Sequence, residues 1–215
     1  MELNILKKNH GLISVIIVIF YSVGIAGLSI EFSREIFRQL VPLTLLGSAV
    51  LMLLMDQSSS IRLWWILIFI YFSSFLVEMA GVNTGLIFGE YEYGETLGFK
   101  ILGTPLIIGI NWIILVYAIW QSVGSLKMHG ILKVIIASGA MVIYDYALEP
   151  IAITLDMWSW GMGDIPVQNY IAWFVISLVF FAILELARVR IRNRISLVLL
   201  LTQFFFFVVL NFTLK

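Results

Sequence analysis

The chain has 215 residues, of which 61% are hydrophobic and 12% are charged, and its formal net charge is zero. This composition excludes an ordinary soluble domain and predicts a polytopic membrane protein. The balanced charge gives no basis for nucleic acid as a partner. Because the chain has no cysteine, disulfides, thiolate nucleophiles and iron–sulfur ligands are excluded.

Seven apolar runs are long enough to cross a bilayer, which takes about 20 residues. In chain order they cover residues 11–31, 40–56, 61–82, 103–122, 131–153, 168–187 and 195–213. The second run is short, so six spans remain an alternative. The sequence therefore predicts an all-α fold, a polytopic transmembrane helix bundle of about seven spans, in which residues 1–215 form a single integral membrane domain.

The distribution of lysine and arginine predicts the orientation of these spans. With seven spans, one side carries Lys7, Lys8, Arg62, Lys127, Lys133, Arg188, Arg190, Arg192 and Arg194, and the other carries Arg34, Arg38, Lys100 and Lys215. Basic residues favour the cytoplasmic side. The N-terminus is therefore expected in the cytoplasm and the C-terminus outside, in the inner (cytoplasmic) membrane of a bacterium.

Three carboxylates lie inside or near the ends of predicted spans. Glu78 is near the outer end of the third, and Asp145 and Glu149 are in the outer half of the fifth, where their i, i+4 spacing puts them on one helix face. A charge at the middle of a bilayer costs about 3 kcal/mol, so such residues are functional candidates by default. The structural alternative is that they sit at helix ends and reach the headgroups.

The loops at 83–102 and 154–167 emerge on the same, outer side and predict an acidic, aromatic, glycine-rich cap over these carboxylates. The cap carries Glu90, and its aromatic residues could instead be interfacial anchors. Asn111 and Asn169 lie within spans, where lone polar residues often only tie helices together. Pro150 is expected to break or kink the fifth span.

Two blocks of the sequence carry closely spaced motifs. The first contains Glu78, Gly81, Gly85, Phe88, Gly89, Tyr91, Tyr93, Leu97, Gly98, Gly103 and Pro105, and the second contains Asp145, Leu148, Pro150, Trp158, Trp160, Ile165, Pro166, Asn169 and Trp173. In these residues the chain resembles the integral-membrane carotenoid biosynthesis family that includes the carotenoid ψ-end hydratases. The resemblance extends from about Phe75 to Trp173. Four positions depart from the family pattern, which has Val, Trp, Asp and Gly where this chain has Thr104, Tyr144, Glu149 and Asp164. Tyr144 and Glu149 preserve the aromatic and carboxyl character of the pattern, whereas Thr104 and Asp164 bear on the substrate more than on the reaction type.

The resemblance implies addition of water across the terminal double bond of an acyclic carotenoid end group, which gives a tertiary alcohol. An unactivated alkene must first be protonated to a tertiary cation, which requires a positioned acid in a dry pocket and aromatic faces around the cation. We assign Asp145 as the proton donor, Glu78 as the partner that shares or relays the proton, and Glu149 or Glu90 as the base on the water side. The substrate-binding candidates are Tyr91, Tyr93, Asn111, Trp112, Tyr144, Tyr146, Trp158, Trp160, Asn169 and Trp173.

No metal and no cofactor are expected, because alkene hydration needs a proton more than a Lewis acid. The expected partners are a carotenoid within the bilayer, water and membrane lipid, and the sequence does not predict an oligomeric state. The pocket is expected to open on the outer side between the third, fifth and sixth spans.

Several alternatives share parts of this pattern. A carotenoid end-group cyclase would form the same first cation, and a transporter or lipid-handling protein would use the carboxylates as proton relays. A prenyltransferase would need two aspartate-rich clusters, of which only the Asp145-x-x-x-Glu149 pair is a remote candidate. A retinal-binding protein would need a lysine inside the last span, which has none.

Overall fold

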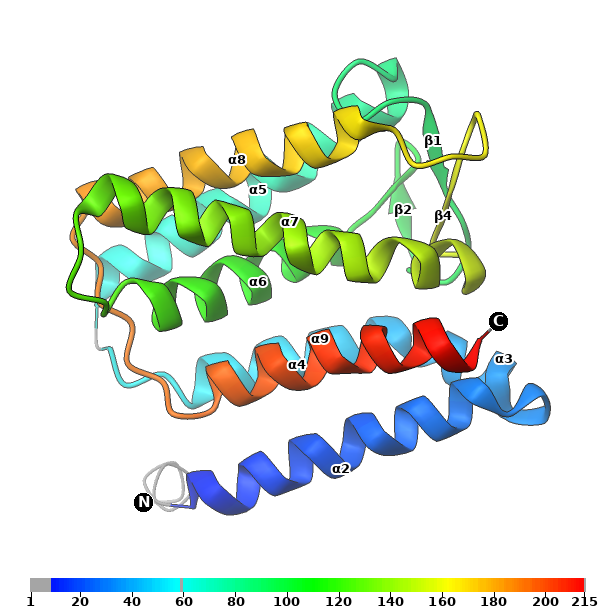
Figure 1. The fold of residues 1–215 in the computed structure, drawn as a ribbon, viewed down its shortest axis with the longest axis horizontal. Helices are drawn as coiled ribbons and strands as arrows, with labels where there is room; N and C mark the ends of the chain where they lie inside the picture. Colours follow the sequence, from blue (N-terminus) through cyan, green and yellow to red (C-terminus); the bar gives the residue numbers. More distant parts are fainter. Residues whose placement is uncertain (1–8, 59, 215) are drawn as a thin grey trace.

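The computed structural model describes residues 9–58 and 60–214, which form a bundle of helices with a small cap of β-strands at one end (Figure 1). The helices are α2 (His10–Ser29), α3 (Glu31–Gln39), α4 (Val41–Leu54), α5 (Ile61–Thr84), α6 (Ile107–Val123), α7 (Gly130–Thr154), α8 (Val167–Leu186) and α9 (Ser196–Thr213). The strands are β1 (Tyr91–Tyr93), β2 (Lys100–Ile101), β3 (Thr104–Pro105) and β4 (Trp158–Trp160).

Each of the seven predicted apolar runs coincides with a helix. The largest difference is in the fourth run, where α6 begins only at Ile107 because β2 and β3 pair as a short antiparallel hairpin before it. The sequence did not predict the short helix α3 between the first two runs. This helix has Glu31 in its first turn and Arg38 in its last, charges that complement the helix dipole.

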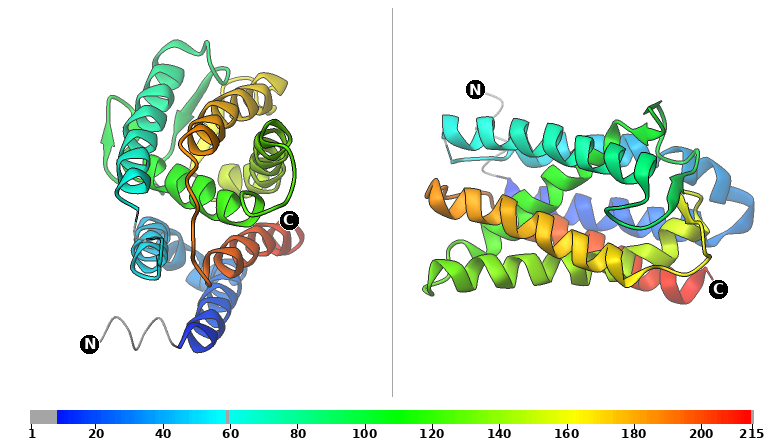
Figure 2. Two further views of the ribbon diagram at one scale, coloured as in Figure 1. Left: turned by 90° about the vertical axis from the view of Figure 1, so that its left-hand side faces the viewer. Right: turned by 90° about the horizontal axis from the view of Figure 1, so that it is seen from above.

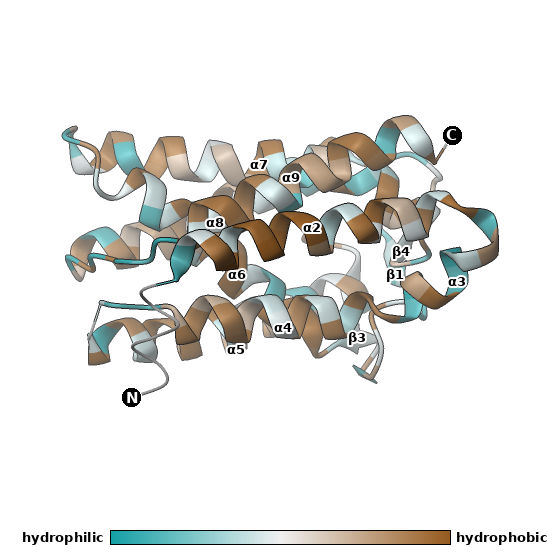
Figure 3. Ribbon diagram, turned by 90° about the horizontal axis from the view of Figure 1, so that it is seen from below, coloured by the Kyte–Doolittle hydropathy of each residue, from teal (hydrophilic) through white to brown (hydrophobic). Residues whose placement is uncertain are grey.

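The helices are apolar enough for a membrane protein, and by length and composition five or six of them could cross a membrane. Within residues 9–58 and 60–214, five helices have the length and hydropathy of a span, namely α2, α5, α7, α8 and α9. Helices α3 and α4, bent by 53°, count as a sixth if they are taken together, and α6 is a shorter apolar helix. Apolar residues dominate α2 along most of its length, while hydrophilic residues gather toward the two ends of the bundle (Figure 3).

Local signals explain where α5 begins and ends, whereas the proline in α7 does not end that helix. The Ser60 hydroxyl accepts from the Leu63 N–H and caps α5, which ends at Gly85 in the left-handed region, with a φ of 67°. Helix α7 runs through Pro150 to Thr154, so the expected break does not occur there. Proline removes a single backbone donor, and it lies in the last turns of a helix that packs along α8.

Helix α6 lies inside the bundle and packs against α4, α5, α7, α8 and α9 (Figure 2). Of its 17 residues, 13 are buried. The outer helices instead expose large apolar side chains such as Phe20, Leu43, Trp65 and Val175, which suits a surface in contact with lipid.

The cap joins the two motif blocks. Strands β1 and β4 pair antiparallel, with Tyr91 opposite Trp160 and Tyr93 opposite Trp158. The Gly94 N–H donates to the Met157 carbonyl at 3.0 Å, next to the pair. Because side chains alternate along a strand, these four aromatic residues all point to the same face of the ribbon. That face covers the cap ends of α5, α7 and α8, where the predicted carboxylates lie.

Candidate functional site

Glu78, on α5, is buried and accepts three hydrogen bonds from aromatic side chains. The indole N–H of Trp112 donates to Oε1 at 3.0 Å, and the hydroxyls of Tyr91 and Tyr93 each donate to Oε2 at 2.7 Å. Burial, together with the neighbouring Glu78 charge, holds the pKa of both hydroxyls above the usual value for tyrosine. Both tyrosines therefore keep their protons and remain donors to Glu78.

Glu149, on α7, is held in a second aromatic frame. The indole N–H groups of Trp158 and Trp160 donate to Oε2 at 3.0 and 2.9 Å. The Asn169 side-chain amide donates to Oε1 at 3.0 Å. The pairing of β1 with β4 explains this arrangement, because it aligns both tryptophans on the face that carries Tyr91 and Tyr93.

Asp145 lies one helical turn before Glu149 and is fully buried. Its Oδ2 accepts from the same Asn169 amide nitrogen at 2.8 Å, whereas its Oδ1 is buried without a hydrogen-bond partner among the described residues. Asn169, at the start of α8, therefore bridges the two acids of α7. Asp145 has fewer donors than either glutamate.

The cluster contains three acids and no countercharge. Within the part of the chain that the structure describes, no lysine or arginine nitrogen lies within 4.0 Å of these three carboxyl groups. Nor is any group of three or more histidine, aspartate or glutamate side chains there arranged to hold a metal ion. Three ionised carboxylates that are buried together without a basic group nearby would repel one another strongly. The arrangement therefore favours retention of a proton within the cluster.

A small cavity lies between Glu78 and Glu149. Its free space is about 20 Å³, enough for roughly one water molecule. Trp173 forms part of the wall and stacks on Trp112, with the ring centroids 4.4 Å apart. The lining residues are Glu78, Phe88, Tyr91, Tyr93, Ile108, Asn111, Glu149, Trp158, Trp160, Asn169 and Trp173.

The structure brings together most of the residues singled out in the sequence, with three exceptions. Tyr144 is buried against Phe204 and Phe207 and lines a different cavity. Tyr146 is 70% exposed on the outside of α7, and Glu90 is exposed and does not line the cavity. Successive residues of a helix point about 100° apart, so Tyr144 and Tyr146 diverge from Asp145 between them.

Two wall residues were not among the sequence-based candidates. Phe88 belongs to the glycine-rich motif, so the motif itself could have identified it. Ile108 lies near the start of α6, one turn before Trp112, and carries no chemical signal that would separate it from the other apolar residues of that helix. Only the packing of the helix reveals its role.

Comparison with known proteins gives the family. The sequence pattern of the family described as "Carotenoid biosynthesis protein" matches residues 39–215. The chain belongs to this family. The resemblance based on the two motif blocks is thereby confirmed.

This carotenoid biosynthesis protein also has a distant curated relative. It is 25% identical to the bisanhydrobacterioruberin hydratase of Haloarcula japonica in an alignment of 115 positions that covers 47% of this chain and 38% of the relative. The match thus covers well under half of that hydratase. No solved structure matches the chain. Helix α2 lies outside the family match, whereas all of the carboxylate cluster lies within it.

Proposed function

We propose that this protein hydrates the terminal double bond of an acyclic (ψ) carotenoid end group. The observation that carries the proposal is the pairing of two aromatic-framed carboxylates, Glu78 and Glu149, across a small cavity with room for about one water molecule. Alkene hydration needs a proton donor, stabilisation of a tertiary cation and one water molecule. The name of the distant relative, a hydratase, points to the same reaction class.

The proton comes from the Asp145–Glu149 pair. Both carboxyl groups accept from one amide nitrogen of Asn169, so they lie close together, and keeping one proton between them avoids two adjacent negative charges. Glu149 lines the cavity and Asp145 does not. In this scheme Glu149 delivers the proton to the alkene and Asp145 acts behind it, which revises the direct donor role that the sequence suggested for Asp145.

Glu78 acts on the water side. Its three donors favour the carboxylate form, which can orient the attacking water and accept its proton. The alkene gains a proton at one carbon and the water oxygen at the tertiary carbon, and the second proton of that water returns to the cluster. The faces of Trp158, Trp160 and Trp173 stabilise the intermediate cation. No metal or cofactor enters this scheme.

The end group is larger than the present cavity, so the cap must move away from the helices before the substrate can bind. Phe88 comes from the glycine-rich segment between α5 and β1 and belongs to the part of the wall that lies outside the helices. The substrate is expected to enter from the bilayer between α5, α7 and α8, with its long chain along the lipid-facing surface.

Expression in a lycopene-producing host, followed by mass spectrometry of the extracted pigments, tests the reaction. A gain of one water per modified end group supports hydration. An unchanged mass with altered retention indicates cyclisation and contradicts the proposal, and unmodified lycopene with the protein present in the membrane contradicts action on that end group.

We further propose seven membrane crossings, with α4 and α6 as the two short ones and the cap on the non-cytoplasmic side of a bacterial inner membrane. The alternation of the helices between the two ends of the bundle supports this topology (Figure 1). Reporter fusions in the cap and after α9 test it. Cytoplasmic signals from both positions would contradict the orientation.

A further inference from the structure

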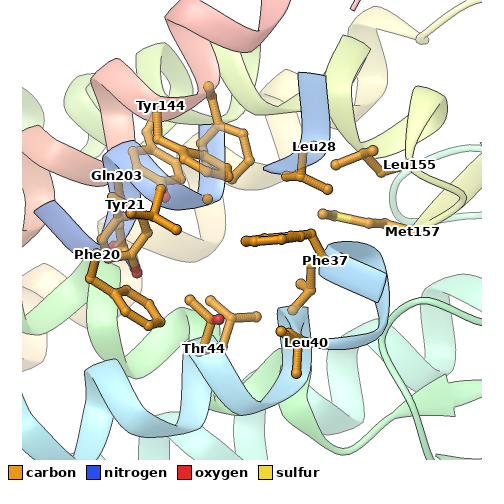
Figure 4. A pocket seen from close by; sticks show the side chains of 16 residues that line it. Phe20, Tyr21, Leu28, Phe37, Leu40, Thr44, Tyr144, Leu155, Met157 and Gln203 are labelled. Atoms are coloured by element: carbon orange, nitrogen blue, oxygen red, sulfur yellow. The ribbon is translucent and has the colours of Figure 1, made fainter. Parts of the chain in front are cut away.

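A second cavity lies on the other side of α7, between α2, α4 and α9, and holds about 120 Å³ of free space (Figure 4). Its wall is mostly aromatic and aliphatic and contains no charged residue. Phe37, Phe206 and Phe207 contribute aromatic surface, and Thr44 is one of its few polar side chains. The cavity therefore suits an uncharged, apolar ligand.

A buried polar network forms one side of this cavity. The Tyr21 hydroxyl is 2.8 Å from the Ser48 hydroxyl, and the side-chain amide of Gln203 donates to Tyr21 at 2.7 Å. Gln203 is only 2% exposed, and its Oε1 has no hydrogen-bond partner among the described residues. A buried acceptor left unpaired is costly, and Gln203 lines the cavity, so a ligand that reaches this side chain could supply the missing donor.

The two cavities lie back to back along the same segments. Tyr144 lines the second cavity, whereas its chain neighbour Asp145 belongs to the carboxylate cluster. After α7, Met157 lines the second cavity and Trp158 lines the first. The second cavity is therefore separate from the proposed reaction site, and α7 with the segment that follows it forms the wall between the two.

We propose that the second cavity binds a linear isoprenoid alcohol, with its chain among the aromatic side chains and its hydroxyl donating to Oε1 of Gln203. The ligand is expected to carry a hydroxyl because Oε1 of Gln203 lacks a hydrogen-bond donor. Its chain is expected to be uncharged because the wall of the cavity is apolar and has no charged residue. The isoprenoid nature of the chain rests on the proposed function, whose product is such an alcohol. The same chemistry is offered by free prenyl alcohols of the membrane.

Photolabelling tests this site without any turnover. The protein is placed in phosphatidylcholine nanodiscs with a diazirine-bearing farnesol, or with its methyl ether, and the labelled peptides are mapped. The ether lacks the donor, so the alcohol should label peptides of α2, α4 or α9 about tenfold more strongly, which corresponds to about 1.4 kcal/mol. Equal labelling by alcohol and ether would overturn the proposal.

Two variants test the place and the polar contact. Thr44→Trp fills the cavity and should lower labelling at least tenfold, whereas Leu43→Trp, at a neighbour that is 65% exposed and outside the wall, should not. Gln203→Leu removes the acceptor and should abolish the difference between alcohol and ether. Full labelling of Thr44→Trp would contradict the assigned site.

Unlabelled competitors distinguish the source of the ligand. Displacement of the label by a monohydroxylated acyclic carotenoid supports the reaction product as the occupant, and displacement by geranylgeraniol alone supports a prenyl alcohol. Equal or stronger displacement by a diacylglycerol, which also has a free hydroxyl, would overturn the assignment to isoprenoids. Glu78→Gln, impaired in the proposed reaction, should label like the wild type, so the site can be established even if the hydration proposal fails.

Discussion

The replacement Glu78→Gln tests the proposed mechanism most directly, because it removes an ionisable group while preserving the shape of the side chain. Glu78 accepts from one indole N–H and two tyrosine hydroxyls. The glutamine carbonyl can still accept from Trp112. The hydroxyls of Tyr91 and Tyr93 can turn and accept from the amide NH₂, so no donor is forced against another donor.

The expected cost to folding is similar in size to the free energy that a 100-fold loss of activity represents, about 2.7 kcal/mol, so activity is compared at equal amounts of folded protein. A hydrogen bond to a charged group contributes about 1.5–3 kcal/mol and a neutral one about 0.5–1.5 kcal/mol. Weakening each of three bonds by about 1 to 1.5 kcal/mol therefore lowers the free energy of unfolding by about 3 to 4.5 kcal/mol, and removal of a buried charge offsets part of this. Hydration should nevertheless fall at least 100-fold, roughly the contribution of one general base.

The assay is the pigment composition of a lycopene-producing host, normalised to the amount of variant protein in the membrane. Glu185→Gln is the matched control, because Glu185 lies near the end of α8 that is farthest from the cap. This control should retain nearly full turnover. If Glu78→Gln hydrates at more than about a tenth of the wild-type rate, the water-side role of Glu78 is refuted.

Three further replacements follow from the same geometry. Asp145→Asn should fold, because its oxygen can still accept from the α8 amide, yet hydration should fall about 100-fold; wild-type pigment yield would exclude a proton-holding role. Trp158→Phe removes one of two indole donors to Glu149. Loss of this hydrogen bond, which contributes about 1–2 kcal/mol, should lower hydration about tenfold in the pigment analysis. Gly81→Ala places a methyl group 2.6 Å from an aromatic carbon of the cavity wall and should lower both activity and thermal stability. Gly139→Ala, with no neighbour within 4 Å, should leave activity unchanged and is the control in the same melting and pigment assays.

Much of the architecture was determined by the sequence because the responsible signals are local. Apolar runs of bilayer length predicted the positions of the long helices, and the i, i+4 spacing of Asp145 and Glu149 predicted their shared helix face. The two motif blocks gave the family and named most of the residues that meet in the carboxylate cluster. Local signals fail where the outcome depends on packing, as at Pro150, which α7 accommodates without a break.

Only the tertiary structure decided which atoms meet. Tyr144 lines the second cavity, whereas its neighbour Asp145 belongs to the carboxylate cluster, because helix rotation within the bundle sets the direction of each side chain. The pairing of β1 with β4 brings together aromatic residues nearly 70 positions apart and surrounds two acids with donors. The cavity beside Gln203 likewise arises where α2, α4, α7 and α9 fail to fill the space between them. Contacts of this kind join segments far apart in the chain, so no local pattern in the sequence encodes them.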